Sequence, residues 1–389
     1  MSRRRVLLFC HDSRGLGHLR RISRIAAALG QDFASLIVTG MPDAQWLIPA
    51  GCELLKLPNW DNISAERAQR DDRLSWLGLS HEDAGSFRSQ LIRAAGEAFK
   101  PHAILVDYLP FGMGDELRPL LGGSTARKYL IHRGVSHHAA GSMLGGAATR
   151  AIADSYNRVI VTADQRISDV AKEYEFVEAA AKKILYAGYV GPDACARDDG
   201  NGTGLPSGRP LIVCSCGSGY RGEQLFAACV RAARDLGDYD FEVVLGPHGS
   251  LQPGTHSSVS RNCRLTRVHH NLAALHQAAA VVITHGGYNS VLEAVSGGAR
   301  ILVFHLREGP YNERIYFEQR LRSHYPIRPV VSLDHLVDDI KVEVERALAA
   351  GRAAFKLNFA GLASIVNIIR EDLGMTDTGS VIRHGSSCG

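Results

Sequence analysis

Short apolar runs alternate with amphipathic segments in two successive series along this chain. The first series opens with Val6–Phe9 and a helical pattern over Gly17–Leu29, and the second opens with Leu211–Ser215 and Gln224–Leu236. Strands that alternate with helices form parallel sheets with helices on both faces. The sequence therefore predicts an α/β protein with two doubly wound parallel-sheet domains.

A stretch rich in glycine, proline and aspartate separates the two series and predicts a linker. We expect a first domain over residues 1–188, the linker over 189–210, a second domain over 211–353, a helix within 354–375 and a flexible tail over 376–389. Met41–Pro58 is expected to be irregular, and Asn62–Asp83 to be an exposed loop or a surface helix. Further strands are expected at Ser35–Thr39, Ala103–Val106, Lys128–His132, Arg158–Thr162, Phe241–Leu245, Val281–Thr284 and Arg300–Phe304, and further helices at Phe87–Phe99, Ala147–Ser155, Leu272–Gln277, Ser290–Ser296, Glu313–Arg322, Leu333–Ala350 and Ala354–Leu373.

The bulk composition is that of an ordinary globular protein. Hydrophobic residues make up 45% and charged residues 22% of the 389 residues, and the net charge of +4 is too small to predict nucleic-acid binding. A weak attraction to anionic substrates or to a membrane surface stays open. No apolar run approaches the roughly 20 residues of a membrane helix, and the run after Arg3–Arg5 is too short for an export signal. The eight cysteines are scattered, so we expect a reduced, cytoplasmic protein, either a monomer or a homodimer.

The most specific motif follows the apolar run that ends at Thr284. Gly286 and Gly287 stand where a strand gives way to a helix, so the backbone can approach a ligand closely and the helix N-terminus can bind an anion. Asn289 and Ser290 are suitable N-terminal capping residues, and Glu293 lies one turn further on, where it can accept hydrogen bonds from a ribose. The pattern predicts a site for a nucleoside diphosphate; the alternative is a strand–loop–helix turn with glycines that only serve packing.

A second turn of small residues follows the strand Leu211–Ser215. Gly217, Ser218 and Gly219 suit a loop that contacts phosphate, although a plain turn between a strand and a helix is the alternative. In either case the turn is expected at the same sheet edge as Gly286–Gly287.

The turn after the first strand contains Gly15-x-Gly17-His18. A dinucleotide-binding fingerprint needs a third glycine where Arg20 stands, which argues against that function. His18 has an ordinary pKa of about 6.5 and is the candidate general base for an acceptor hydroxyl. The alternative is that His18 only holds the loop. His11 and Asp12 are nearby candidates, and Asp12 is also placed to orient a histidine.

Two of these motifs resemble those of known enzymes. The order His285-Gly286-Gly287-x-Asn289-Ser290-x-x-Glu293-Ala294 resembles the donor signature of GT-B glycosyltransferases. The block Gly15–Arg21 is similar to the N-terminal motif of the family 28-like peptidoglycan N-acetylglucosaminyltransferases and their uncharacterised bacterial relatives, and Asp107–Gly112 and Pro42 also fit those relatives. The resemblance extends from about Val6 to about Leu321.

The resemblance implies a GT-B fold, with two Rossmann-like domains and a cleft between them. The N-terminal domain would bind the acceptor and the C-terminal domain a nucleotide sugar, for which UDP is the expected nucleotide, and the last helix would cross back to the first domain. The expected activity is metal-independent transfer with inversion, in natural-product (antibiotic) or cell-envelope glycan synthesis. The expected site residues are His18 and Asp12 for catalysis; Gly217, Ser218, Gly219, His285, Gly286, Gly287, Asn289, Ser290, Glu293, Glu313 and Arg314 for the donor; His270 and Leu272 near the nucleobase; and Gly17, Asp107, His132 and Arg133 for the acceptor.

The chain departs from the family pattern at two places. Arg314 stands where glutamine is common, and this leaves the donor sugar open. His132–Arg133 stands where the peptidoglycan enzyme carries His-Glu, which predicts a changed acceptor site. A nucleotide-sugar hydrolase and a non-catalytic sugar-nucleotide-binding protein remain alternatives.

We expect no cofactor and no metal site. The adjacent histidines His269–His270 and His137–His138 have diverging side chains, and Cys214 and Cys216 lie in an apolar strand where packing is the better interpretation.

Overall fold

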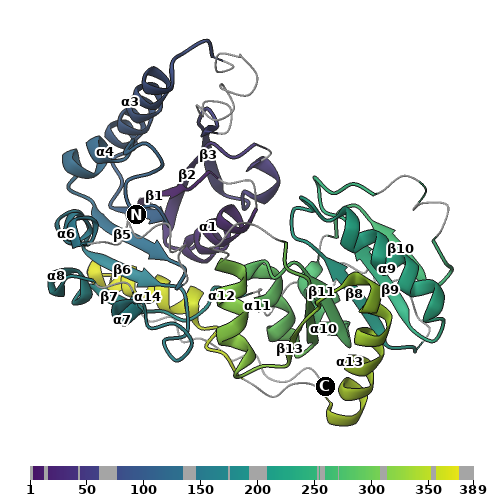
Figure 1. Cartoon of the computed structure of the whole chain (residues 1–389). Helices are drawn as coiled ribbons and strands as arrows, with labels where there is room; N and C mark the ends of the chain where they lie inside the picture. Colours follow the sequence, from purple (N-terminus) through teal and green to yellow (C-terminus); the bar gives the residue numbers. More distant parts are fainter. Residues whose placement is uncertain are drawn as a thin grey trace.

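Two parallel sheets organise the chain (Figure 1). The computed structural model describes residues 3–12, 16–42, 44–60, 77–134, 146–173, 176–191, 208–251, 254, 259–269, 271–306, 313–351 and 356–375. The first sheet has seven strands in the order β3-β2-β1-β4-β5-β6-β7. Its strands are β1 (Arg4–Cys10), β2 (Phe33–Thr39), β3 (Cys52–Lys56), β4 (Ala103–Asp107), β5 (Arg127–His132), β6 (Arg158–Val161) and β7 (Ile184–Tyr186).

The second sheet has six strands in the order β10-β9-β8-β11-β12-β13. Every strand pair in both sheets is parallel, which confirms the predicted architecture of two doubly wound domains. The strands are β8 (Leu211–Ser215), β9 (Asp240–Val244), β10 (Cys263–Thr266), β11 (Val281–Thr284), β12 (Arg300–Val303) and β13 (Ile327–Pro329).

Helices cover these sheets. In the first half they are α1 (Gly17–Leu29), η1 (Ala44–Leu47), α3 (His81–Phe99), α4 (Arg118–Gly123), α6 (Gly146–Ser155), α7 (Val170–Glu173) and α8 (Glu178–Ala181). In the second half they are α9 (Glu223–Asp235), α10 (Leu272–Ala278), α11 (Tyr288–Gly297), α12 (Glu313–Arg322), η5 (Leu333–His335), α13 (Leu336–Ala350) and α14 (Gly361–Asp372). None of the described helices combines the length and the apolar character that a membrane span requires.

Apolar periodicity explains why α1 forms and where it packs. Its buried side chains Leu19, Ile22 and Ile25 recur at helical spacing, and they pack in one cluster with Leu8 of β1.

The helix α14 packs on the first domain. Its residues Ile365 and Ile369 belong to the same apolar cluster as α1, and Oδ1 of Asp372 lies 3.2 Å from Nη2 of Arg158. The last helix that the structure describes, α14, therefore covers the first domain (Figure 1).

The structure corrects several expected elements. Met41–Pro58 is not irregular, because it contains η1 and the edge strand β3; the exposed Glu53 and Lys56 within that strand hide its pattern. The helix expected at Phe87 begins at His81, where the hydroxyl of Ser80 accepts a hydrogen bond from the N–H of Asp83. Most of Asn62–Asp83, most of the expected linker and the expected tail lie outside the described residues.

Candidate functional site

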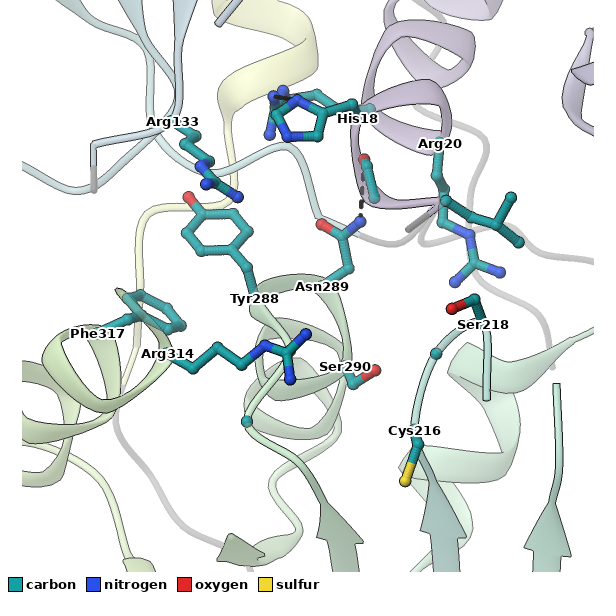
Figure 2. Close-up of a pocket in the computed structure, with 16 residues that line it drawn as sticks. His18, Arg20, Arg133, Cys216, Ser218, Tyr288, Asn289, Ser290, Arg314 and Phe317 are labelled. Carbon is teal, nitrogen blue, oxygen red and sulfur yellow. Dashed lines mark hydrogen bonds between the residues drawn. The ribbon is translucent and has the colours of Figure 1, made fainter. Parts of the chain in front are cut away.

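A cavity of ≈ 300 Å³ lies where the carboxyl ends of the two sheets face each other (Figure 2). Its walls come from the N-terminal ends of α1 and α11 and from the turn after β8, as expected for ligand sites in doubly wound proteins. The lining residues are Leu16, Gly17, His18, Arg20, Arg21 and Arg133 from the first domain, and Cys216, Gly217, Ser218, Gly286, Gly287, Tyr288, Asn289, Ser290, Arg314 and Phe317 from the second.

The turn into α11 requires glycine. Gly286 has a φ of 75°, and a Cβ there would lie 3.0 Å from Cγ1 of Val303. The N-cap is Gly287, which supplies no side-chain hydrogen bond, so the first N–H groups of α11 stay available to an anion. The expected capping role of Asn289 and Ser290 is therefore wrong, since both residues lie inside the first turn. Both still line the cavity.

The turn after β8 is equally tight. Gly217 has a φ of 64° and lines the cavity together with Ser218. Gly219 has a φ of 86°, and a Cβ there would lie 1.9 Å from the carbonyl oxygen of Leu245. Gly219 is thus needed for the close approach of two loops, whereas Gly217 and Ser218 face the space where a ligand would lie.

Positive charge dominates the described walls of the cavity. Four arginines line it, namely Arg20, Arg21, Arg133 and Arg314, and no aspartate or glutamate is among the lining residues that the structure describes. Together with the N-terminus of α11, these guanidinium groups create a site that favours a polyanion.

His18 and Asp107 form a close pair beside this cavity. Nδ1 of His18 lies 2.6 Å from Oδ2 of Asp107, and Nε of Arg21 donates to Oδ1 of Asp107 at 3.0 Å. Burial would raise the pKa of Asp107, but Arg21 and His18 hold this pKa well below its usual range. Burial lowers the pKa of His18, and Asp107 opposes that shift. At neutral pH the ring is therefore neutral and able to accept a proton.

Asp12 lies elsewhere, and the carboxylate that holds His18 is Asp107. Oδ1 of Asp12 accepts from the N–H of Gly40 at 2.7 Å, and Oδ2 accepts from Nη1 of Arg88 at 2.9 Å. Burial raises the pKa of Asp12. Asp12 is not among the cavity-lining residues, and His11 contacts the ring of His18 edge-on, with the centroids 5.1 Å apart.

Glu293 is buried against the first domain. Its Oε1 lies 3.0 Å from Nη2 of Arg24 and 3.3 Å from Nη1 of Arg20, and both arginines belong to α1. Burial would raise the pKa of Glu293, but Arg20, His276 and Arg24 together lower it, so the carboxylate is ionised. Oε2 is buried and has no hydrogen-bond partner among the described residues; Nδ1 of His276 is 3.9 Å away.

The other expected site residues are distributed as follows. Arg314 lines the cavity at the start of α12, beside Glu313. Arg133 also lines it, with its guanidinium 4.7 Å from the ring centroid of Tyr108. Three other expected residues do not line the cavity. Nδ1 of His132 accepts from the N–H of Gly134 at 3.1 Å, and the ring nitrogens of His285 face the carbonyl oxygens of Phe304 and Arg221. Leu272 packs in the core. His270 lies outside the described residues.

Sequence reasoning missed six lining residues, namely Leu16, Arg20, Arg21, Cys216, Tyr288 and Phe317. In the sequence, Arg20 breaks a glycine fingerprint and belongs to the Gly15–Arg21 block, and neither pattern assigns it a site role, yet it lines the cavity. Tyr288 connects the domains, since its hydroxyl donates to the carbonyl oxygen of Thr162 at 2.9 Å, and Phe317 packs on its ring. The position of Tyr288 between Gly287 and Asn289 was the available signal. Nowhere in the described residues do three or more His, Cys, Asp or Glu side chains lie close enough together to hold a metal ion.

Solved structures with the same two-domain arrangement include three of low sequence identity. One is described as the glycotransferase of kitacinnamycin; it is 17% identical, with 96% of this chain and 100% of that chain aligned and a TM-score of 0.65. The glycosyltransferase SnogD from Streptomyces nogalater is 15% identical over 96% of each chain, with a TM-score of 0.62.

The chain has the GT-B fold. A putative UDP-N-acetylglucosamine 2-epimerase from Listeria monocytogenes shares it, with 13% identity, 98% of this chain and 99% of that chain aligned and a TM-score of 0.63. No family model matches the sequence, and no curated protein matches it. At these identities the similarity establishes the fold, and the chemistry has to be argued from the site.

Proposed function

We propose that the protein is a glycosyltransferase that moves a sugar from a nucleoside-diphosphate sugar, most simply a UDP-sugar, to an acceptor hydroxyl. The observation that carries this proposal is that one cavity joins the N-terminus of α11, the Gly217–Ser218 turn and His18 of the opposite domain. One wall suits an anion, and the facing wall carries a neutral histidine held by a carboxylate.

The second domain would bind the donor. The N–H groups at the start of α11 and the Gly217–Ser218 turn would hold the diphosphate, and Arg314 would lie toward the sugar. Fixed dipoles and guanidinium groups at the leaving group stabilise the charge that develops as its bond breaks, and such preorganised stabilisation is usually the largest catalytic contribution. This arrangement supports leaving-group departure without a metal ion.

The first domain would bind the acceptor. His18 would take the proton from the acceptor hydroxyl while that oxygen attacks the anomeric carbon. The bond from this carbon to the diphosphate oxygen breaks in the same step, so the configuration inverts. Asp107 would keep the ring oriented and stabilise its protonated form, and Arg133 would contact the acceptor.

Incubation of the pure protein with UDP-sugars tests this proposal. Turnover that needs an added hydroxyl-bearing acceptor supports a transferase. Release of UDP and free sugar without an acceptor would indicate a hydrolase, a rearranged UDP-sugar would indicate an epimerase, and binding without turnover would indicate a binding protein.

Activity is expected to survive exhaustive chelation with EDTA. A loss of activity that magnesium or manganese restores would contradict the metal-independent mechanism.

The choice of acceptors in this assay tests which biosynthetic pathway the protein serves. Two of the structurally similar proteins are described as a glycotransferase of kitacinnamycin and the calicheamicin glycosyltransferase, which makes antibiotic aglycones the first acceptors to try. Saccharide and lipid-linked acceptors of cell-envelope synthesis come next.

A further inference from the structure

Arg20 reaches from the first domain into the cavity wall of the second. It lies in the first turn of α1, its side chain is 30% exposed, and it lines the cavity. Figure 2 shows its guanidinium extending toward Ser218, whose turn belongs to the opposite domain. The side chain of Arg20 is therefore part of the wall that faces any ligand held by the glycine turns.

The position of α1 against α11 is fixed by contacts that do not involve Arg20. Nδ2 of Asn289 donates to the carbonyl oxygen of Gly17 at 3.2 Å, and Nη2 of Arg24 donates to Oε1 of Glu293 at 3.0 Å. The side chain of Arg24 is 16% exposed, and Arg24 is not among the cavity-lining residues. Glu293 thus keeps a close cationic partner without Arg20.

The contact of Arg20 with Glu293 is the longer one. Nη1 of Arg20 lies 3.3 Å from Oε1, and this is the one hydrogen bond of its guanidinium among the described residues. A guanidinium carries five N–H donors in a planar fork that matches phosphate oxygens. The remaining donors of Arg20 are consequently available to an anion in the cavity.

We propose that Arg20 binds the diphosphate of the donor from the opposite domain. The inference rests on the proposed function and adds a residue to its donor site. Arg20 turns from Glu293 to the phosphate oxygens when the nucleotide binds, while Arg24 stays on Glu293. The leaving group is then held by the second domain's backbone N–H groups and by a first-domain guanidinium, so the charge of the donor itself draws the two domains together.

Calorimetry with UDP, and competition by uridine and by pyrophosphate, tests this inference on Arg20→Ala. UDP and pyrophosphate are expected to bind about 10–100-fold more weakly, because a hydrogen bond between two charged groups is lost. Uridine is expected to bind unchanged, because it has no phosphate. Arg20→Lys should recover part of the UDP affinity, and circular dichroism should show the native fold in both variants.

Arg24→Ala is the matched control, since it removes an arginine from the same helix and the same carboxylate but not from the cavity wall. It is expected to weaken UDP binding less than Arg20→Ala does. Two results would overturn the inference, because each would show that Arg20 acts only through Glu293. One is that Arg20→Ala loses affinity for UDP and for uridine equally. The other is that the two alanine variants lose UDP affinity equally.

Failure of the proposed function gives a different result. If the wild-type protein binds neither UDP nor UDP-sugars, the proposed function itself fails. If the wild type and Arg20→Ala both bind UDP normally, only the role of Arg20 is refuted.

Discussion

Nδ1 of His18 lies 2.6 Å from Oδ2 of Asp107, across the gap between α1 and the carboxyl end of β4. Because Arg21 and His18 keep Asp107 ionised, the carboxylate can only accept, so Nδ1 donates and Nε2 is the unprotonated nitrogen. This is the tautomer that a general base on the cavity wall requires. The same residues sit at the switch point of the first sheet, where β1 and β4 are neighbours.

The substitution His18→Ala is expected to lower turnover far more than donor affinity. A general base acts on the acceptor proton in the transition state, so its loss commonly costs about 10²–10⁴-fold in turnover. His18 belongs to the first domain, whereas the proposed donor site lies mainly in the second. Steady-state kinetics and UDP calorimetry measure the two effects. Near-normal turnover by a folded variant at saturating substrates would exclude His18 as the base and leave His11 to be tested.

The pH dependence of kcat/KM follows from the lowered pKa of His18. Since the neutral ring is the active form and burial lowers its pKa below the ordinary 6.5, activity should stay level from pH 8 down to below pH 6.5. It should fall only at more acidic pH, as the ring becomes protonated. An acidic limb centred above pH 6.5 in the free enzyme would show that another group with a higher pKa acts as the base.

Arg88 is expected to be essential for the stability of the first domain. It is fully buried, with Nη1 2.9 Å from Oδ2 of Asp12 and Nη2 3.1 Å from Oε1 of Glu116. Removing one partner of a buried ionic network leaves uncompensated charges, which costs about 3–5 kcal/mol. Urea unfolding of Arg88→Met measures this loss.

Arg93→Ala is the control for Arg88→Met, because Arg93 lies on the same helix and pairs with Glu97 at 3.4 Å in solvent. Exposed pairs of this kind contribute at most about 0.5 kcal/mol. Similar unfolding free energies for the two variants would mean that the Arg88 network adds nothing to stability.

The regular elements with a strong apolar period were predictable from the sequence. The strand β11 and the helices α1 and α12 have the predicted bounds, and the order of elements gave two parallel sheets. The outer strands β3, β7, β10 and β13 were missed, because each is only three to five residues long and has partly exposed side chains. A short strand with one neighbour carries too little pattern to be distinguished from a loop.

The glycine turns of the site were predictable because they follow buried strands. The contacts between the two domains were not. Glu293 and Arg24 are paired although 269 positions separate them, and no local pattern encodes such a pair. Likewise, Asp12 and Asp107 both lie at the carboxyl ends of strands, and only the position of α1 relative to β4 decides that Asp107 holds His18.

The free energy of unfolding is expected to fall when the pH is lowered from 7 to 5.5, because His132 and His276 are buried as neutral rings. Burial lowers the pKa of His132 to about 3 and the pKa of His276 to about 4, whereas an unfolded histidine has a pKa of about 6.5. Between these values the unfolded chain binds more protons than the folded chain, so acid favours unfolding. The two rings together should cost about 2 kcal/mol over this interval.

Urea unfolding of the wild type and of His276→Asn at both pH values separates the contribution of one ring. Nε2 of His276 lies 3.0 Å from Oγ of Ser215, and asparagine keeps a polar group there but does not titrate. The variant should be less stable at pH 7, yet it should lose about 1 kcal/mol less than the wild type on acidification. His285, whose pKa is raised, shifts stability in the opposite direction, but it is present in both proteins and cancels in the comparison. Parallel losses in the two proteins would mean that His276 takes up no proton on unfolding and is already charged in the folded state.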